Sequence, residues 1–244
     1  MNFLYEDLEF SNFNAEEGSI LELAMCAVID GIEQEPFHEF GKPVNRAFWS
    51  EGAEKVHGIS WGQAQSFQSQ EALAEKALNY INKFETMFTA VGHNIGTDKK
   101  YMENLFRKHS KRQDWLVQVR PKWRCTLKRA KARKTKIRTE NFKLGTLCSH
   151  FSIDIDAHKG LSDMLATIKL DNILDAITPD IKGKAQFMPF EGTWIQKRKR
   201  YLDSKYIIFN GDGELFITKE ATENKEAMQF IMTEIWDMYC EDNV

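Results

Sequence analysis

The order of its apolar segments constrains the fold of this chain most. Segments 2–8, 19–30 and 35–44 have the apolar content of strands and are separated by short polar links. Consecutive strands joined in this way pair antiparallel as neighbours, which predicts a three-strand meander. Helical and strand-like segments then alternate along the chain. These are a helix over 69–84 that begins at a Ser69 cap, a strand over 87–94, and helices over 98–109, 142–153 and 159–177.

This order predicts an α/β layered domain. It contains a mixed sheet, with the antiparallel meander and parallel strands, flanked by helices. The turn residues of 178–184 mark a boundary between a domain over 1–178 and an extension over 179–244. The extension reads as a hairpin around Asn-Gly-Asp-Gly at 210–213, followed by an amphipathic helix over 221–240.

Composition narrows the class of protein. The chain has 244 residues, 42% of them hydrophobic, and a net charge of −3, which suits one large globular domain and favours no partner by global charge. Its four cysteines are far apart and read as reduced thiols. The N-terminus has no signal-peptide pattern, and no apolar run approaches the roughly 20 residues that span a bilayer. We therefore expect a cytoplasmic protein with no membrane partner.

Charge is concentrated in one segment. Residues 107–138 hold fourteen lysines or arginines and a single acid, Asp114, with Trp115 and Trp123 between them. Cations interleaved with aromatic side chains suit a single nucleic-acid strand, although a solvated helix face would have the same composition. The candidate nucleic-acid contacts are Lys122, Trp123, Arg124, Lys128, Arg129, Lys131, Arg133 and Lys134.

Two acids stand two residues apart in the first predicted strand. Asp7 and Glu9 therefore point to the same face. By itself this pair has an ordinary explanation as a solvated strand end. Asp212 and Glu214 form the same local pattern inside the predicted hairpin turn.

Two later corners supply polar partners. Asp98 starts a helix directly after a buried strand, where α/β folds place ligands and where helix caps also favour Asp. His158 and Asp163 are five residues apart and would lie about 140° apart on one helix. They converge only if His158 lies in the loop and Asp163 in the helix, and Gly160 makes that junction plausible. An exposed loop histidine and an ordinary first-turn acid remain the alternative.

In this order and spacing the motifs DLEFSN, VHGIS, GHNIGTD and AHKGLSD resemble those of the DEDDh 3′–5′ exonucleases. That group includes proofreading subunits, oligoribonuclease, RNase T and related phage and bacterial enzymes. The resemblance covers roughly residues 1–177 and implies a ribonuclease H-like fold. The sequence departs from the family pattern after Glu9, where Phe10-Ser11 stands, and before Asp98, where Thr97 replaces the usual aromatic residue.

The resemblance implies hydrolysis of phosphodiester bonds from the 3′ end of single-stranded nucleic acid, DNA somewhat preferred, with release of nucleoside monophosphates. Two Mg²⁺ or Mn²⁺ ions about 3.5–4 Å apart would serve the reaction. The implied metal ligands are Asp7, Glu9, Asp98 and Asp163. His158 would be the general base, and weaker candidates for terminal-nucleotide contacts are Leu8, Phe10, His57 and Asn94.

Two other functions stay open at this point. One is a 3′–5′ exoribonuclease resembling oligoribonuclease. It stays open because no feature of the sequence indicates how a 2′-hydroxyl would be recognised, and that group distinguishes RNA from DNA. The other is an inactive nucleic-acid-binding adaptor. A polymerase or another replication or repair protein is an open partner.

Overall fold

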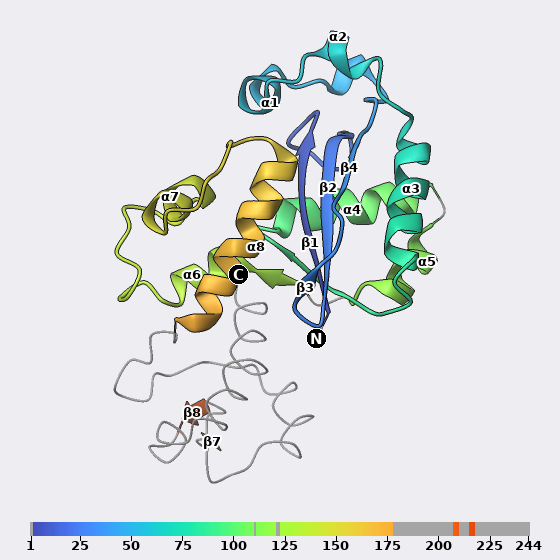
Figure 1. Ribbon diagram of the computed structural model, residues 1–244. Coiled ribbons are helices and arrows are strands. Elements are labelled where there is room, and N and C mark those ends of the chain that lie inside the picture. The colour runs from blue at the N-terminus through green and yellow to red at the C-terminus, as the bar shows by residue number, and fades with distance from the viewer. Residues whose placement is uncertain (1, 110, 121–122, 178–206, 210–214, 218–244) are drawn as a thin grey trace. The chain divides into compact units, whose positions relative to one another are not determined.

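The computed structural model describes residues 2–109, 111–120, 123–177, 207–209 and 215–217 (Figure 1). Its strands are β1 (Phe3–Phe10), β2 (Ile20–Ile29), β3 (Ile32–Glu33), β4 (Phe37–Phe40), β5 (Thr89–Gly92), β6 (Arg124–Cys125), β7 (Ile207–Phe209) and β8 (Leu215–Ile217). Its helices are η1 (Arg46–Phe48), α1 (Glu51–His57), α2 (Trp61–Ala64), α3 (Gln70–Asn82), α4 (Gly96–Lys108), α5 (Arg112–Gln118), α6 (Thr126–Lys131), α7 (Leu144–His150) and α8 (Gly160–Ala176). Within these described residues, no helix is long and apolar enough to cross a membrane.

The main sheet is mixed, as the sequence predicts. Strand β1 pairs antiparallel with β2, which pairs antiparallel with both β3 and β4. On its other side β1 pairs parallel with β5, which pairs parallel with β6. The antiparallel meander and the parallel strands are therefore both confirmed.

Helices cover both faces of this sheet. Figure 1 shows α8 and α3 on opposite sides of the strands. Leu4 and Leu8 of β1 belong to the hydrophobic core formed with α3 and α4, whereas Tyr5 packs with Met164 and Ile168 of α8. Side chains alternate along a strand, so Asp7 lies on the same face of β1 as Tyr5. Asp7 and Glu9 are thereby turned toward α8.

The predicted helices over 69–84, 98–109, 142–153 and 159–177 are confirmed as α3, α4, α7 and α8, with shifted ends. The Ser69 hydroxyl accepts a hydrogen bond from the Ala72 backbone N–H and so begins α3 as expected. The chain divides into two compact units, Met1–Thr178 and Pro179–Val244. In the second unit, β7 and β8 pair antiparallel, as the predicted hairpin requires. The hairpin turn and the predicted helix over 221–240 lie outside the described residues.

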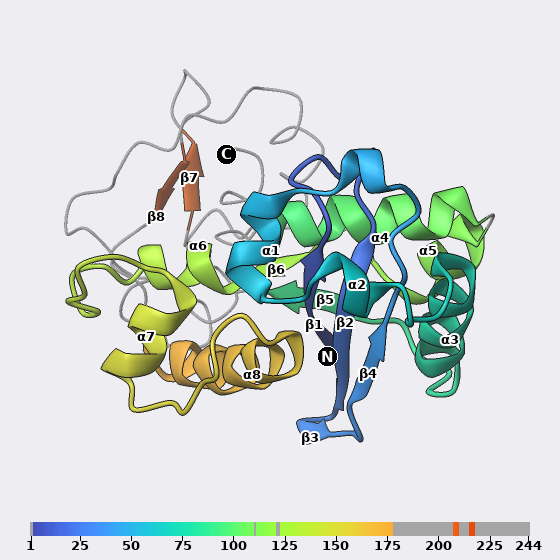
Figure 2. The ribbon, with the colours of Figure 1, turned by 90° about the horizontal axis from the view of Figure 1, so that it is seen from above.

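Two short helices between β4 and α3 are absent from the sequence prediction. The Ser50 hydroxyl accepts from Ala53 N–H at the start of α1, and Gly58 ends that helix in the left-handed conformation with φ +74°. The predicted turn in VHGIS is thus the end of α1. Figures 1 and 2 show α1 and α2 beyond the carboxyl end of β1. This segment therefore lies at the edge of the sheet where β1 ends.

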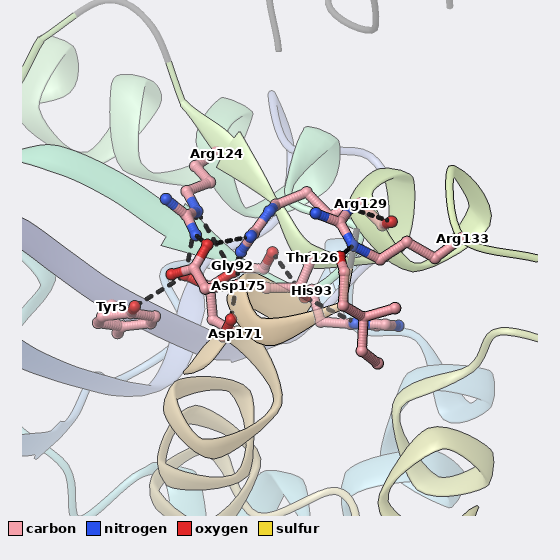
Figure 3. A network of polar contacts seen from close by, with 10 residues as sticks. Tyr5, Gly92, His93, Arg124, Thr126, Arg129, Arg133, Asp171 and Asp175 are labelled. Carbon is pink, nitrogen blue, oxygen red and sulfur yellow. Dashed lines mark hydrogen bonds and ion pairs between the residues drawn. The ribbon is translucent and has the colours of Figure 1, made fainter. Parts of the chain in front are cut away.

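A network of ion pairs centred on a buried aspartate ties α8 to the sheet (Figure 3). Asp171 of α8 is fully buried and accepts a 2.8 Å hydrogen bond from the Tyr5 hydroxyl of β1. Its carboxylate also lies 3.0 Å from Arg124 Nε and pairs with Arg129, both of which pair in turn with Asp175. Because α8 carries Asp163, this network fixes where that carboxylate stands relative to β1.

Asp171→Ala should lower the free energy of unfolding by about 3–5 kcal/mol, because it leaves Arg124 and Arg129 without their buried partner and the Tyr5 hydroxyl without its acceptor. Asp175→Ala is the matched control. Its side chain is 58% exposed, so its loss should cost about 1 kcal/mol or less. Urea unfolding of both variants measures the difference. Equal destabilisation would contradict the role assigned to Asp171.

Candidate active site

The predicted metal ligands come from three elements that meet at one edge of the sheet. Asp7 and Glu9 stand near the carboxyl end of β1. Asp98 is in the first turn of α4, directly after β5, which runs parallel to β1. Asp163 is in the first turn of α8. Because parallel strands end at the same edge, β1 and β5 deliver these carboxylates to one place.

His158 lies in the loop before α8, as convergence with Asp163 requires. It is exposed and has a left-handed backbone, with φ +65°. Its backbone N–H donates a 3.1 Å hydrogen bond to Asp163 Oδ2. Side-chain ligand atoms of Glu9, His158 and Asp163 all lie within 4.8 Å of one another. The histidine is therefore beside the carboxylates without being buried among them.

The carboxylates repel one another. Burial raises the pKa of Asp7 well above its usual range, and the charges of Asp98, Asp163 and Glu9 raise it further. Burial and the Asp163 charge raise the pKa of Glu9 to about 8. Burial is also the largest cause that raises the pKa of Asp98 to about 7 and that of Asp163 to about 6. At neutral pH the cluster requires protons or cations to offset this repulsion.

Divalent cations fit this donor set. Carboxylate oxygens are the ligands that hard cations prefer. Asp163 Oδ1 is buried and has no hydrogen-bond partner among the described residues, so this oxygen is available to coordinate a cation. Asp7, Glu9, Asp98 and Asp163 would hold the ions.

Without divalent cations, the protein should lose stability as pH rises from about 4 to about 8. The folded carboxyls have raised pKa values, of about 8 for Glu9 and about 7 for Asp98. The folded state therefore keeps protons that the unfolded state has released, and the free energy of unfolding falls with rising pH. Mg²⁺ should remove this fall by stabilising the ionised cluster. Melting temperatures across this range, with EDTA and with Mg²⁺, test this; parallel curves would contradict it.

Glu22 of β2 is a fifth carboxylate at this site that the sequence analysis missed. It is buried, lies directly opposite Glu9 in the strand register, and its Oε1 is 2.8 Å from His38 Nε2. A Cβ atom on Gly160 would lie 3.3 Å from the Glu22 carboxylate, so α8 starts against this side chain. An acid within an otherwise apolar buried strand is the signal that could have identified it.

Glu6 is a further buried acid on β1. It is 1% exposed, and neither of its carboxylate oxygens has a hydrogen-bond partner among the described residues. Burial raises the pKa of Glu6 well above its usual range, followed by the charge of Asp98. Strand alternation places it on the opposite face of β1 from Asp7.

The weaker candidates for terminal-nucleotide contacts are placed differently from one another. Leu8 is 4% exposed and belongs to the core, and His57 is equally buried, so both side chains offer little accessible surface to a nucleotide. Phe10 is half-buried and stacks on Tyr101 at a centroid distance of 4.8 Å. Asn94 is exposed, with φ +60°, and stays a candidate.

The aromatic side chains of the basic segment lie inside the protein. Trp115 and Trp123 are buried in the core, where Trp115 stacks on Phe106 at a centroid distance of 5.3 Å. They therefore have no free face for a base.

Three arginines of the segment also bind other parts of the protein. Arg124 and Arg129 pair with the aspartates of α8, and buried Arg133 donates to the Ile177 backbone carbonyl at 2.6 Å. Charge alone could not separate such arginines from solvated ones. Lys131 and Lys134 are exposed, Lys128 is half-buried, and Lys122 lies outside the described residues.

Comparison with known proteins adds two findings. The family model RNase T, described as Exonuclease, matches residues 5–170. Solved structures of exonuclease I share the fold at low identity. Escherichia coli exonuclease I in complex with a dT13 oligonucleotide gives a TM-score of 0.63 at 19% identity, over 72% of this chain and 41% of that one. The zinc-bound E. coli exonuclease I–single-stranded DNA complex gives 0.61 at 21% identity, over 72% and 40%.

A third match extends the likeness beyond E. coli. Exonuclease I from Methylocaldum szegediense gives a TM-score of 0.60 at 16% identity, over 72% of this chain and 40% of that one. The chain thus spans about two fifths of the length of these structures. Among curated proteins, none matches.

Proposed function

The chain belongs to the exonuclease family, whose model matches residues 5–170, and we propose that it is a metal-dependent 3′–5′ exonuclease of the DEDDh type. One observation carries the proposal: four carboxylates from β1, α4 and α8 meet beside an exposed histidine. A cluster of buried acids destabilises the fold when it is ionised. Binding of divalent cations for phosphodiester hydrolysis would account for such a cluster.

In the proposed reaction, a water oxygen attacks the terminal phosphorus and forms a new P–O bond. The P–O bond to the 3′ oxygen of the preceding nucleotide breaks, and that oxygen takes up a proton. The product is a nucleoside 5′-monophosphate. Divalent cations bound by Asp7, Glu9, Asp98 and Asp163 would lower the pKa of water and neutralise charge on the phosphate.

His158 is the proposed general base. It stands in the loop, exposed, with its backbone N–H bonded to Asp163. Its imidazole is therefore held at the edge of the carboxylates, where it can accept the proton of the attacking water and return it to solvent. Glu22 would support the site from β2, because its carboxylate lies against the start of α8.

Single-stranded DNA is the proposed substrate, supported by the DNA oligonucleotides bound to the similar exonuclease I structures. RNA is the alternative. Initial rates on single-stranded DNA, duplex DNA and RNA of one sequence, each with Mg²⁺ and with Mn²⁺, test the proposal. We expect the highest kcat/KM on single-stranded DNA. A higher value on RNA would make the protein an exoribonuclease, and no hydrolysis of any substrate would make it a binding protein.

A further inference from the structure

We propose that an exposed aromatic surface beside the carboxylates stacks the bases of the strand whose 3′ end enters the site. The aromatic surface comprises Phe13, Phe48, Trp49 and Trp61, with the aliphatic side chain of Val56 beside them. This inference rests on the proposed function and states how the substrate is held.

The aromatic surface is unusually exposed for its composition. Phe13 is 63% exposed, Val56 is 47% exposed and Phe48 is 38% exposed. Trp49 and Trp61 are half-buried. Grouped apolar side chains of this size on a protein surface mark a binding site more often than chance exposure.

Hydrogen bonds hold the segment that carries this surface in place. The Asn12 side-chain amide donates to the Phe48 carbonyl at 2.9 Å, and Ser50 N–H donates to the Ser11 carbonyl at 2.8 Å. A Cβ atom on Gly52 of α1 would lie 3.4 Å from the Phe13 ring, so that ring rests against the helix. Val56 follows Gly52 by one helical turn, so its side chain lies on the same face of α1.

The two tryptophans are fixed as well. Their rings meet edge to face, with centroids 5.3 Å apart, and Trp49 Nε1 donates to Glu54 Oε2 at 2.6 Å. The guanidinium of Arg46 lies 5.1 Å from the centroid of the Trp61 ring. Rings held in place before binding lose little conformational entropy when a base stacks on them.

The aromatic surface adjoins the site. Phe13 follows Glu9 by four residues, and its ring centroid lies 5.9 Å from that of Phe10, the last residue of β1. At the other end of α1, burial lowers the pKa of His57, and the charges of Glu22 and His158 also act on it. The first turn of α1 is therefore packed, through Phe13, against the end of β1 that carries Glu9.

Nucleic-acid bases are the ligand whose chemistry fits the aromatic surface. A strand whose terminal phosphate lies at the carboxylates continues over neighbouring protein, and its bases are uncharged rings that stack on aromatic side chains. The acidic site itself repels phosphates until cations are bound. The tryptophans of the basic segment are buried, whereas the aromatic surface exposes rings next to the end of β1 that carries Glu9.

Binding of two strands of equal length and charge tests the inference: fluorescein-labelled oligothymidylate and an abasic strand with the same phosphates. Fluorescence anisotropy with the Asp7→Asn protein avoids hydrolysis. We expect Phe13→Ala and Trp61→Ala, each added to Asp7→Asn, to weaken oligothymidylate binding about fivefold or more, the low end of what loss of one stacked base costs. Binding of the abasic strand should not change, and Trp61→Phe should retain most of the affinity.

Ile32→Ala is the matched control, because Ile32 is 66% exposed and lies in β3, away from the site (Figure 1). Unchanged oligothymidylate binding by Phe13→Ala and Trp61→Ala would overturn the inference, as would equal loss for both strands. A change of oligomeric state without a change in DNA binding would assign the surface to a second copy of the chain. In each case wild-type hydrolysis is scored separately, so failure of the aromatic surface is distinguishable from failure of the proposed function.

Discussion

Asp7→Asn should reduce hydrolysis by a factor on the order of 10³ while the protein stays folded. Asp7 is the carboxylate on which the charges of Asp98, Asp163, Glu9 and Glu22 all act, so its replacement disrupts the site for every cation. The same replacement removes one of the mutually repelling charges. In EDTA at neutral pH, the variant should therefore melt at the same temperature as wild type or higher.

Release of nucleotides and thermal unfolding, measured on the same preparations, check this pair of effects. Asp154→Asn is the matched control, because Asp154 is an exposed acid ahead of the His158 loop. It should leave both measurements unchanged. An Asp7→Asn protein with wild-type turnover, or one that is unfolded in EDTA, would contradict the role assigned to Asp7.

His158→Ala should reduce kcat by about 10²–10⁴-fold, the usual contribution of a general base. Cation affinity should be retained, because the remaining donors are carboxylates. The alternative is a ligand role, since a ring nitrogen of His158 lies within 4.8 Å of oxygens of Glu9 and Asp163. Calorimetric titration with Mn²⁺ and steady-state kinetics separate the two roles.

Added imidazole provides the control for this variant. If His158 moves a proton, free imidazole should restore part of the lost kcat to His158→Ala and have little effect on Asp7→Asn. Loss of Mn²⁺ affinity in His158→Ala, without rescue by imidazole, would show that the histidine is a ligand instead.

Much of the fold follows from local patterns in the sequence. The apolar run of 19–30 is buried along β2, and the Ser69 cap starts α3. The short helices α1 and α2 have no sustained apolar period, and they begin at serine caps that the sequence analysis did not use. In the basic segment, the abundance of charge concealed α5 and α6.

The positions of candidate site residues were predictable where loops and helix starts place them. His158 before α8 and Asp163 within it stand as the spacing required, because Gly160 begins the helix between them. Glu22 was missed because its place opposite Glu9 depends on strand register, which no local motif specifies. The ion pairs of Arg124 and Arg129 were not predictable because their partners, Asp171 and Asp175, are more than forty residues away in the chain.

The central claim is that this chain removes nucleotides stepwise from a 3′ end with the help of divalent cations. The most direct test is the size distribution of a 5′-labelled single-stranded DNA during incubation with the wild-type protein and Mg²⁺. We predict a ladder of labelled products that shorten one nucleotide at a time, and an intact strand in EDTA. Immediate release of the label as a mononucleotide, products cut in the middle of the strand, or the same ladder in EDTA would contradict the account.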